Sequence, residues 1–223
     1  MLHKKNKTRY VGNLVDNILK RDIEQRHKIK YVGAFEQLTH HLLNIAPAIV
    51  VEKDLMSLVG LKSNHTINNY VGFLKEAYLL LGVRRYSTKS SQRVRAEKVY
   101  PVDVALMDSR PDAFVGENVG WRLETIVFIE LLRRNRPIGR DIYYYKSIAG
   151  YEADFVVCKN NVVEEIYQVS YDITKEKLII RPLNYNDNWY ELKYKINNFS
   201  CLYFNIITEV KPSSSIESEI NSY

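Results

Sequence analysis

Cysteine is scarce in this sequence, and long apolar runs are missing. Cys158 and Cys201 lie far apart without His or Cys neighbours at ligand spacing, which argues against a zinc site and a disulfide framework. The densest apolar run, Ala77 to Val83, is far shorter than the roughly 20 residues that cross a bilayer. No apolar segment follows the basic N-terminus, so it does not resemble a secretory signal. We therefore expect a cytoplasmic protein with no membrane role.

Positive charge is unevenly distributed along the chain. The net charge is +6, and 46% of the residues are hydrophobic, which is enough for a packed core. Basic side chains gather at the N-terminus and again between Arg84 and Lys98, where Glu97 is the one acidic residue. Such patches favour polyanions, because each neutralised phosphate releases condensed counterions. A solvated surface that keeps the protein soluble explains the same charges equally well.

The spacing of apolar residues in the first half predicts helices followed by a hairpin. An amphipathic helix is predicted over residues 10–29, and three shorter helices over residues 34–46, 52–60 and 63–76. Gly60 is placed to close the second of these, and Ser63 or Asn64 to cap the third. Strands over residues 78–86 and 99–107 flank a polar, basic loop. Three helices and a basic hairpin form a winged helix.

A winged helix that binds DNA uses its third helix and its hairpin. Polar side chains at the start of the third helix would face the major groove, and basic side chains of the hairpin would contact phosphates. The first set is Asn64, His65, Asn68 and Asn69, and the second is Arg84, Arg85, Lys89, Arg93 and Arg95. The alternative is a protein-interaction or spacer domain with the same fold.

The second half predicts a helix and then strands. The helix covers residues 114–134, and strands follow at 140–147, 151–159 and 162–172. A helical or irregular segment, a strand at 199–208 and a polar tail complete the chain. The fold class is α/β, or α+β overall. The expected division is a linker helix at 1–32, a winged-helix domain at 33–108, a second domain at 109–210 and a disordered tail at 211–223.

Acidic residues stand at notable positions in these strands. Strand alternation places Glu152 and Asp154 on one face, with Ala153 and Phe155 on the other. On the next strand Gln168 and Ser170 share a face.

Together with Glu124 on the preceding helix, these positions resemble the restriction-endonuclease-like, PD-(D/E)xK, nuclease core. In that core carboxylates hold Mg²⁺ and a Lys helps to activate water. Here Gln168 and Ser170 replace a Glu and a Lys, which weakens Mg²⁺ binding and removes a cation. The residues leave three interpretations open: a degenerate site, an active nuclease, or carboxylates gathered by coincidence. Lys146 is either a substitute cation or a fold-stabilising partner of Glu152 or Glu124.

The whole arrangement resembles the C-terminal portion of prokaryotic AAA-like ATPases that end in a domain of unknown function. The resemblance is carried by "YVGNLVDNILKRDI", "LKSNHTINNYVGFLKEAYLL", "KVYPVDVALM", "LETIVFIELLRR" and "IYYYKSIAGYEADFVV" followed by "IYQVSYD". It implies a winged helix followed by a nuclease-like mixed sheet flanked by helices. Its site positions fall on Glu124, Glu152 and Asp154, with Gln168 and Ser170 at its Glu-x-Lys pair.

The phosphate-binding loop of such ATPases, G-x-x-x-x-G-K-[ST], is missing from these 223 residues. We therefore expect no ATP binding by that mechanism, and Mg²⁺ only if the nuclease-like site is active. A fragment, the product of a split or frameshifted gene, or a free-standing remnant would each explain the absence. The favoured function is a non-catalytic module that binds DNA or a partner protein. The alternatives are a Mg²⁺-dependent nuclease using Glu124 and Asp154, and an oligomerisation or docking element for a separate ATPase subunit.

Overall fold

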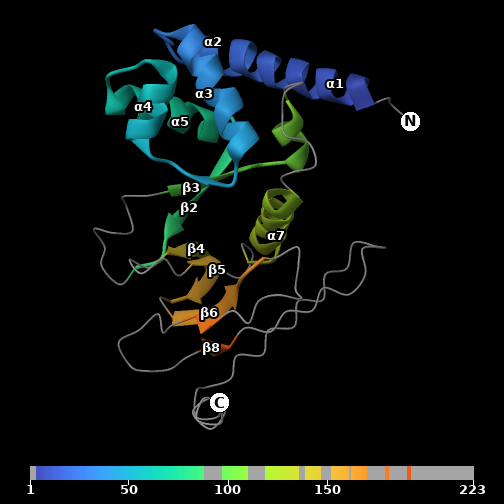
Figure 1. Cartoon of the computed structure of the whole chain (residues 1–223), viewed down its shortest axis with the longest axis vertical. Coiled ribbons are helices and arrows are strands. Elements are labelled where there is room, and N and C mark those ends of the chain that lie inside the picture. The colour runs from blue at the N-terminus through green and yellow to red at the C-terminus, as the bar shows by residue number, and fades with distance from the viewer. Residues whose placement is uncertain are drawn as a thin grey trace, which may run out of the picture.

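The computed structural model of the chain has the helices of its first half at one end and a sheet leading away from them, and one further helix lies beside that sheet (Figure 1). It describes residues 4–87, 97–109, 119–135, 139–146, 152–160, 162–169, 179–180 and 190–191. In this described part no helix is long and apolar enough to cross a membrane.

The first helix begins and ends earlier than the predicted range of 10–29, and it is not uniform. It runs as α1 (Lys4–Asn17), a π-helical turn η1 (Ile18–Ile23) and α2 (Glu24–Arg26) without a break. Val15, Leu19 and Ile23 are buried, so the side chains four residues apart form the face that packs on the rest of the protein. The predicted amphipathic helix is confirmed.

Three helices follow, as predicted. They are α3 (Val32–Ile45), α4 (Glu52–Val59) and α5 (Asn64–Glu76). Gly60 ends α4 in the left-handed conformation at φ 66°, and the Ser63 side chain accepts a hydrogen bond from the amide of Thr66 at the start of α5. Ile67, Tyr70, Val71 and Leu74 form the buried face of α5. They pack in one core with residues of η1 and α3.

The predicted hairpin is confirmed, but its second strand is shorter than expected. Strand β2 (Leu80–Arg85) pairs antiparallel with β3 (Glu97–Pro101), from Leu80 opposite Pro101 to Arg84 opposite Glu97. The prediction that the strand continues to Met107 is wrong. Asp103 caps the amide of Ala105, and the chain turns into the 3₁₀ helix η2 (Val104–Asp108).

The second half contains the predicted helix and strands, but the last of these strands ends at Tyr167, earlier than predicted. Helix α7 (Val119–Asn135) is followed by β4 (Asp141–Lys146), β5 (Glu152–Lys159) and β6 (Val162–Tyr167). Two further short strands, β7 (Ile179–Ile180) and β8 (Tyr190–Glu191), pair where a helical or irregular segment was predicted. The strand predicted at 199–208 lies outside the described residues.

One sheet joins the two halves of the described chain. Its strand order is β1-β3-β2-β4-β5-β6, where β1 (Ala48–Ile49) pairs with β3. All of these pairs are antiparallel except β2 with β4, where Arg84 and Arg85 lie opposite Tyr143 and Tyr144. The fold is therefore mixed α/β, as predicted at this level, with an open six-stranded mixed sheet. The predicted domain boundaries stay predictions.

Helix α7 packs on one face of this sheet. Val127, Phe128 and Leu131 of α7 form a buried cluster with Phe155 and Val157 of β5. Tyr100 of β3 belongs to the same cluster, and its ring lies 4.4 Å from that of Phe128 between centroids. The helix is therefore fixed over strands from both halves of the chain, and this junction positions the candidate site.

Candidate functional site

A bulge in β5 places Asp154 beneath α7. Tyr143 pairs with Val156 and Tyr145 with Ala153, so Asp154 and Phe155 together lie opposite Tyr144 alone. Such a bulge breaks the alternation of side chains and turns two successive residues to one face. Phe155 stacks on Phe128 of α7 at 5.8 Å between ring centroids. The prediction that Asp154 and Phe155 point to opposite faces is therefore wrong.

Glu124 of α7 lies in the same buried site. Its carboxylate oxygen Oε1 accepts a hydrogen bond from the Tyr100 hydroxyl at 2.6 Å and lies 2.6 Å from Lys98 Nζ. Both Glu124 and Asp154 are 8% exposed, so water contributes little to the solvation of either carboxylate. Two buried carboxylates require a compensating cation close by.

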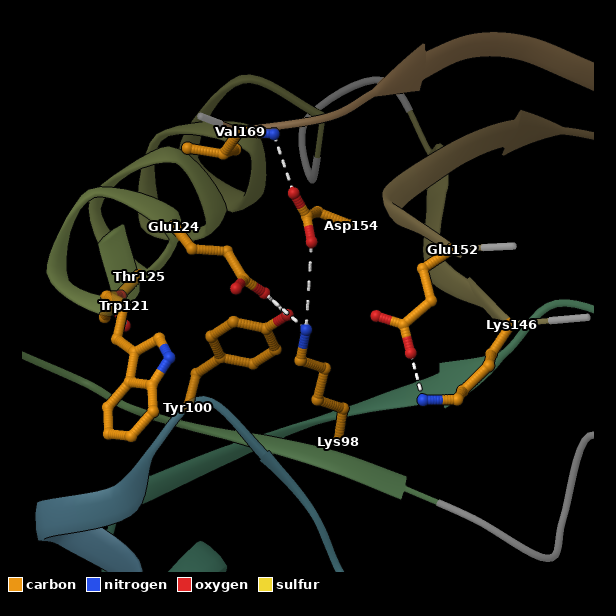
Figure 2. Close-up of polar contacts among 9 residues, drawn as sticks. All are labelled: Lys98, Tyr100, Trp121, Glu124, Thr125, Lys146, Glu152, Asp154 and Val169. Atoms are coloured by element: carbon orange, nitrogen blue, oxygen red, sulfur yellow. Dashed lines mark hydrogen bonds and ion pairs between the residues drawn. The ribbon is translucent and has the colours of Figure 1, made fainter. Parts of the chain in front are cut away.

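Lys98 supplies that cation from strand β3. Its Nζ lies 2.6 Å from Glu124 Oε1 and 3.9 Å from Asp154 Oδ1, and Figure 2 shows the ammonium between the two carboxylates. Lys98 and Tyr100 are two residues apart on one strand, so they share a face and both reach Glu124. We refer to Lys98, Tyr100, Glu124 and Asp154 as the buried cluster.

Lys98 is a residue of the site that the sequence pattern did not predict. The charge pattern places Lys98 among the surface charges of a basic loop, whereas the side chain is 13% exposed and lies inside the protein. The available signal was the alternation of Lys98 and Tyr100 at the start of a strand. That signal was insufficient, because the parallel pairing of β2 with β4, which brings β3 near β5, cannot be read from spacing.

The pKa of Asp154 is raised from 3.8 to about 7, mainly because burial penalises its charged form and secondarily because Glu124 lies nearby. Lys98 and the amide of Val169, which donates to Asp154 Oδ2 at 2.6 Å, oppose this rise. Burial and the neighbouring Glu124 also raise the pKa of Tyr100 well above 10. Tyr100 therefore stays a neutral phenol that donates to Glu124.

Glu152 and Lys146 form a separate, more exposed pair. Lys146 Nζ contacts Glu152 Oε1, and both side chains are nearly half exposed. Figure 2 shows this pair beside the buried cluster, with Lys146 directed at Glu152. This contact agrees with the alternative in which Lys146 is a fold-stabilising partner of Glu152.

Gln168 and Ser170 were predicted at the positions of a catalytic Glu and Lys. Gln168 follows β6, is partly buried, and directly precedes Val169, whose amide binds Asp154. Ser170 lies outside the described residues. The described part of the site thus joins Glu124 and Asp154, as predicted, while the nearby cation comes from β3.

Mg²⁺ does not fit the buried cluster as it stands. Within the described ranges, no three His, Cys, Asp or Glu side chains form a group that could hold a metal ion. The two carboxylates are already neutralised in part by Lys98. Mg²⁺ prefers an octahedron of oxygen ligands, and an ammonium between two carboxylates competes directly with it.

Some of the residues predicted to contact DNA are exposed, and one of them has a partner within the protein. Asn64, His65, Asn68 and Asn69 are all exposed on one face of α5. Arg84 is exposed on β2, whereas the guanidinium of Arg85 donates to the carbonyl oxygen of Lys146. The remaining predicted cations, Lys89, Arg93 and Arg95, lie outside the described residues.

Fold and site together define a mixed α/β protein with a buried pair of carboxylates bridged by a lysine. Residues 1–110 match the family model described as "Domain of unknown function (DUF8612)". An uncharacterized protein of Methanocaldococcus jannaschii is 30% identical over 165 residues, covering 72% of this chain and 36% of that protein. An uncharacterized protein of Haemophilus influenzae is 26% identical over 167 residues, covering 73% of this chain and 40% of that protein.

The chain therefore spans well under half the length of these curated relatives. No solved structure matches it significantly.

Proposed function

We propose that the chain is a non-catalytic, nuclease-like module that binds duplex DNA. In this proposal α3 to β3 are a winged helix, and α7 with β4 to β6 are a restriction-endonuclease-like domain. The module belongs to the C-terminal part of an AAA-like ATPase. The greater length of the relatives is compatible with an additional motor region, although their names describe no activity.

The observation that carries the non-catalytic assignment is the position of Lys98. A nuclease of this type uses paired carboxylates to bind a divalent metal ion. Here the Lys98 ammonium lies 2.6 Å from Glu124 and 3.9 Å from Asp154, so it occupies the space and neutralises the charge that would attract the metal. The raised pKa of Asp154 weakens metal binding further, because a protonated carboxyl is a poor ligand.

The DNA-binding assignment is supported by α5. Four polar side chains at its N-terminal half are exposed, while the opposite face is buried against the other helices. The third helix of a winged helix enters the major groove with side chains at these positions. Exposed Arg84 and Lys62 add positive charge for phosphate contacts.

The non-catalytic assignment and the DNA-binding assignment are both tested with purified protein and a labelled duplex. We expect binding in fluorescence anisotropy that weakens as salt rises, and no cleavage when Mg²⁺ or Mn²⁺ is added. Absence of binding at low salt would refute the DNA-binding assignment. Metal-dependent cleavage that disappears in Asp154→Ala would instead support the alternative nuclease.

Docking on a separate ATPase subunit is a second candidate, favoured by the exposed side of α1. Tyr10 and Leu14 lie one helical turn apart and are 65% and 40% exposed. Apolar side chains at this spacing suit a helix-to-protein contact. Co-purification with an ATPase that is lost in Tyr10→Ser/Leu14→Ser would support docking, and retained co-purification in that variant would refute it.

A further inference from the structure

Gly72 lies within α5 although the fold does not need a glycine there. A Cβ built at this position would meet no atom within 4 Å, and the backbone has no positive φ that would favour glycine. Glycine inside a helix is unfavourable relative to alanine, because the unfolded chain loses more conformational freedom. The missing side chain therefore has no explanation within the described structure.

Gly72 is partly buried and continues, one turn further along α5, the exposed face that was proposed to meet DNA. At 100° per residue it lies between Asn68 and His65 around the helix axis, one turn beyond Asn68 and Asn69. The buried residues Ile67 and Leu74 are on the opposite side. A glycine at the end of a contact face, with no atom within 4 Å of where its Cβ would lie, permits a partner's backbone to approach the helix closely.

The side chains of this face are amides and an imidazole. Asn64, His65, Asn68 and Asn69 are exposed, and none of them carries the guanidinium or ammonium that commonly reads guanine. The nearby Lys75 is paired with Glu97, with Nζ 2.7 Å from Oε2. Asparagine pairs in bidentate fashion with the N6 and N7 atoms of adenine in the major groove.

One of these amides is already oriented. Asn69 Nδ2 donates to His65 Nε2 at 3.2 Å, one turn back along the helix. This bond uses one of the two amide hydrogens. The other hydrogen and the carbonyl oxygen stay available for adenine N7 and for the N6 amino group.

We infer that α5 reads adenine in the major groove through Asn68 and Asn69, and that Gly72 admits the DNA backbone close to the helix. This inference rests on the proposed DNA-binding function and specifies its substrate class. It predicts sequence preference in place of purely electrostatic binding.

The experiment begins with selection from randomised duplexes by the full chain. We expect adenines to be enriched at two or more positions within one helix footprint. In anisotropy, replacing one such adenine by 7-deazaadenine removes the N7 acceptor and should weaken binding by about 5- to 150-fold. The matching variant, Asn68→Ala or Asn69→Ala, should lose this discrimination. Asn13→Ala, at an exposed asparagine on α1, is the control and should retain it.

The variant Gly72→Ala distinguishes an effect on DNA contact from an effect on folding stability. We expect it to raise the thermal midpoint of the protein and to weaken DNA binding at least about 5-fold, as loss of one good contact would. Gly33→Ala is the matched control, because a Cβ at this helical glycine of α3 also meets no atom within 4 Å. It should raise the midpoint without changing binding.

The outcomes distinguish this inference from the function on which it rests. Binding to all duplexes with equal affinity, and equally in Gly72→Ala, would overturn adenine reading and leave DNA binding in place. Binding to no duplex at all would overturn the proposed function itself.

Discussion

Lys98 Nζ lies 2.6 Å from Glu124 Oε1, although the two residues are 26 positions apart and belong to different halves of the chain. Lys98 comes from the hairpin and Glu124 from the helix that covers the sheet. Their ion pair is buried, so it links the two halves in an environment where unpaired charge is costly.

The first prediction concerns the loss of Lys98. Lys98→Met leaves Glu124 and Asp154 buried without their cation, so we expect the free energy of unfolding to fall by about 3 kcal/mol. Urea unfolding at pH 8 measures this change. Lys146→Met is the control, because the Lys146–Glu152 pair is 47% and 46% exposed and should contribute less than about 1 kcal/mol. Equal losses in the two variants would contradict a special role for Lys98.

The second prediction concerns pH. Asp154 has an ordinary pKa of 3.8 in the unfolded chain and a pKa of about 7 in the folded protein. Between these values the folded state keeps a proton that the unfolded state has released, so stability falls as pH rises from about 4 to about 7. At 1.36 kcal/mol per pH unit, the titration of Asp154 lowers the free energy of unfolding over this range by at most about 4 kcal/mol.

Asp154→Asn removes this titration and still offers an oxygen to the Val169 amide. We expect the variant to be more stable than the wild type at pH 8 and to lose that advantage as the pH is lowered to about 4. Unfolding curves at several pH values measure the difference. Asp141→Asn, on the exposed start of β4, serves as the control. Parallel curves for wild type and Asp154→Asn would show that Asp154 does not titrate in this range.

The third prediction concerns metal ions. If the Lys98 ammonium excludes a divalent cation, Lys98→Gln should open a weak site between Glu124 and Asp154. Mn²⁺ should then raise the thermal midpoint of Lys98→Gln while leaving the wild type unchanged. The expected stabilisation is about 1 kcal/mol when free metal is five times its Kd. The double variant Lys98→Gln/Asp154→Asn should lose the effect, and stabilisation of the wild type by Mn²⁺ would contradict exclusion by Lys98.

The fourth prediction concerns the phosphate contacts. Arg84→Ala should weaken binding to all duplexes alike and reduce the slope of log affinity against log salt by about 1. Lys159→Ala removes an exposed cation on β5 and should leave the slope unchanged. If both variants behave like the wild type, Arg84 does not contact DNA.

Periodicity predicted the order of the elements well, because it depends only on neighbouring residues. The helices over the first half, the hairpin and the strands β4 to β6 were all found in the predicted order, although β3 and β6 end earlier than apolar spacing predicted. The 3₁₀ turn η2 was missed because the cap by Asp103 decides it, and apolar spacing does not register a single side-chain hydrogen bond.

The site was less predictable, because it depends on contacts between distant segments. Glu124 and Asp154 were identified from their positions, but Lys98 enters only through the pairing of β2 with β4. The bulge that turns Asp154 toward α7 likewise has no period that a sequence could reveal. Which cation accompanies a pair of carboxylates is therefore a property of the whole sheet.

The most direct test of the account is a gel assay in which the wild type is incubated with a labelled duplex and Mg²⁺ or Mn²⁺. The proposed DNA binding by α5 predicts a retarded band. A cluster neutralised by Lys98 predicts that the DNA in this band is recovered intact, in the presence and absence of metal. Cleaved DNA that requires the metal and disappears in Asp154→Asn would contradict the central claim that Lys98 has replaced the metal ion.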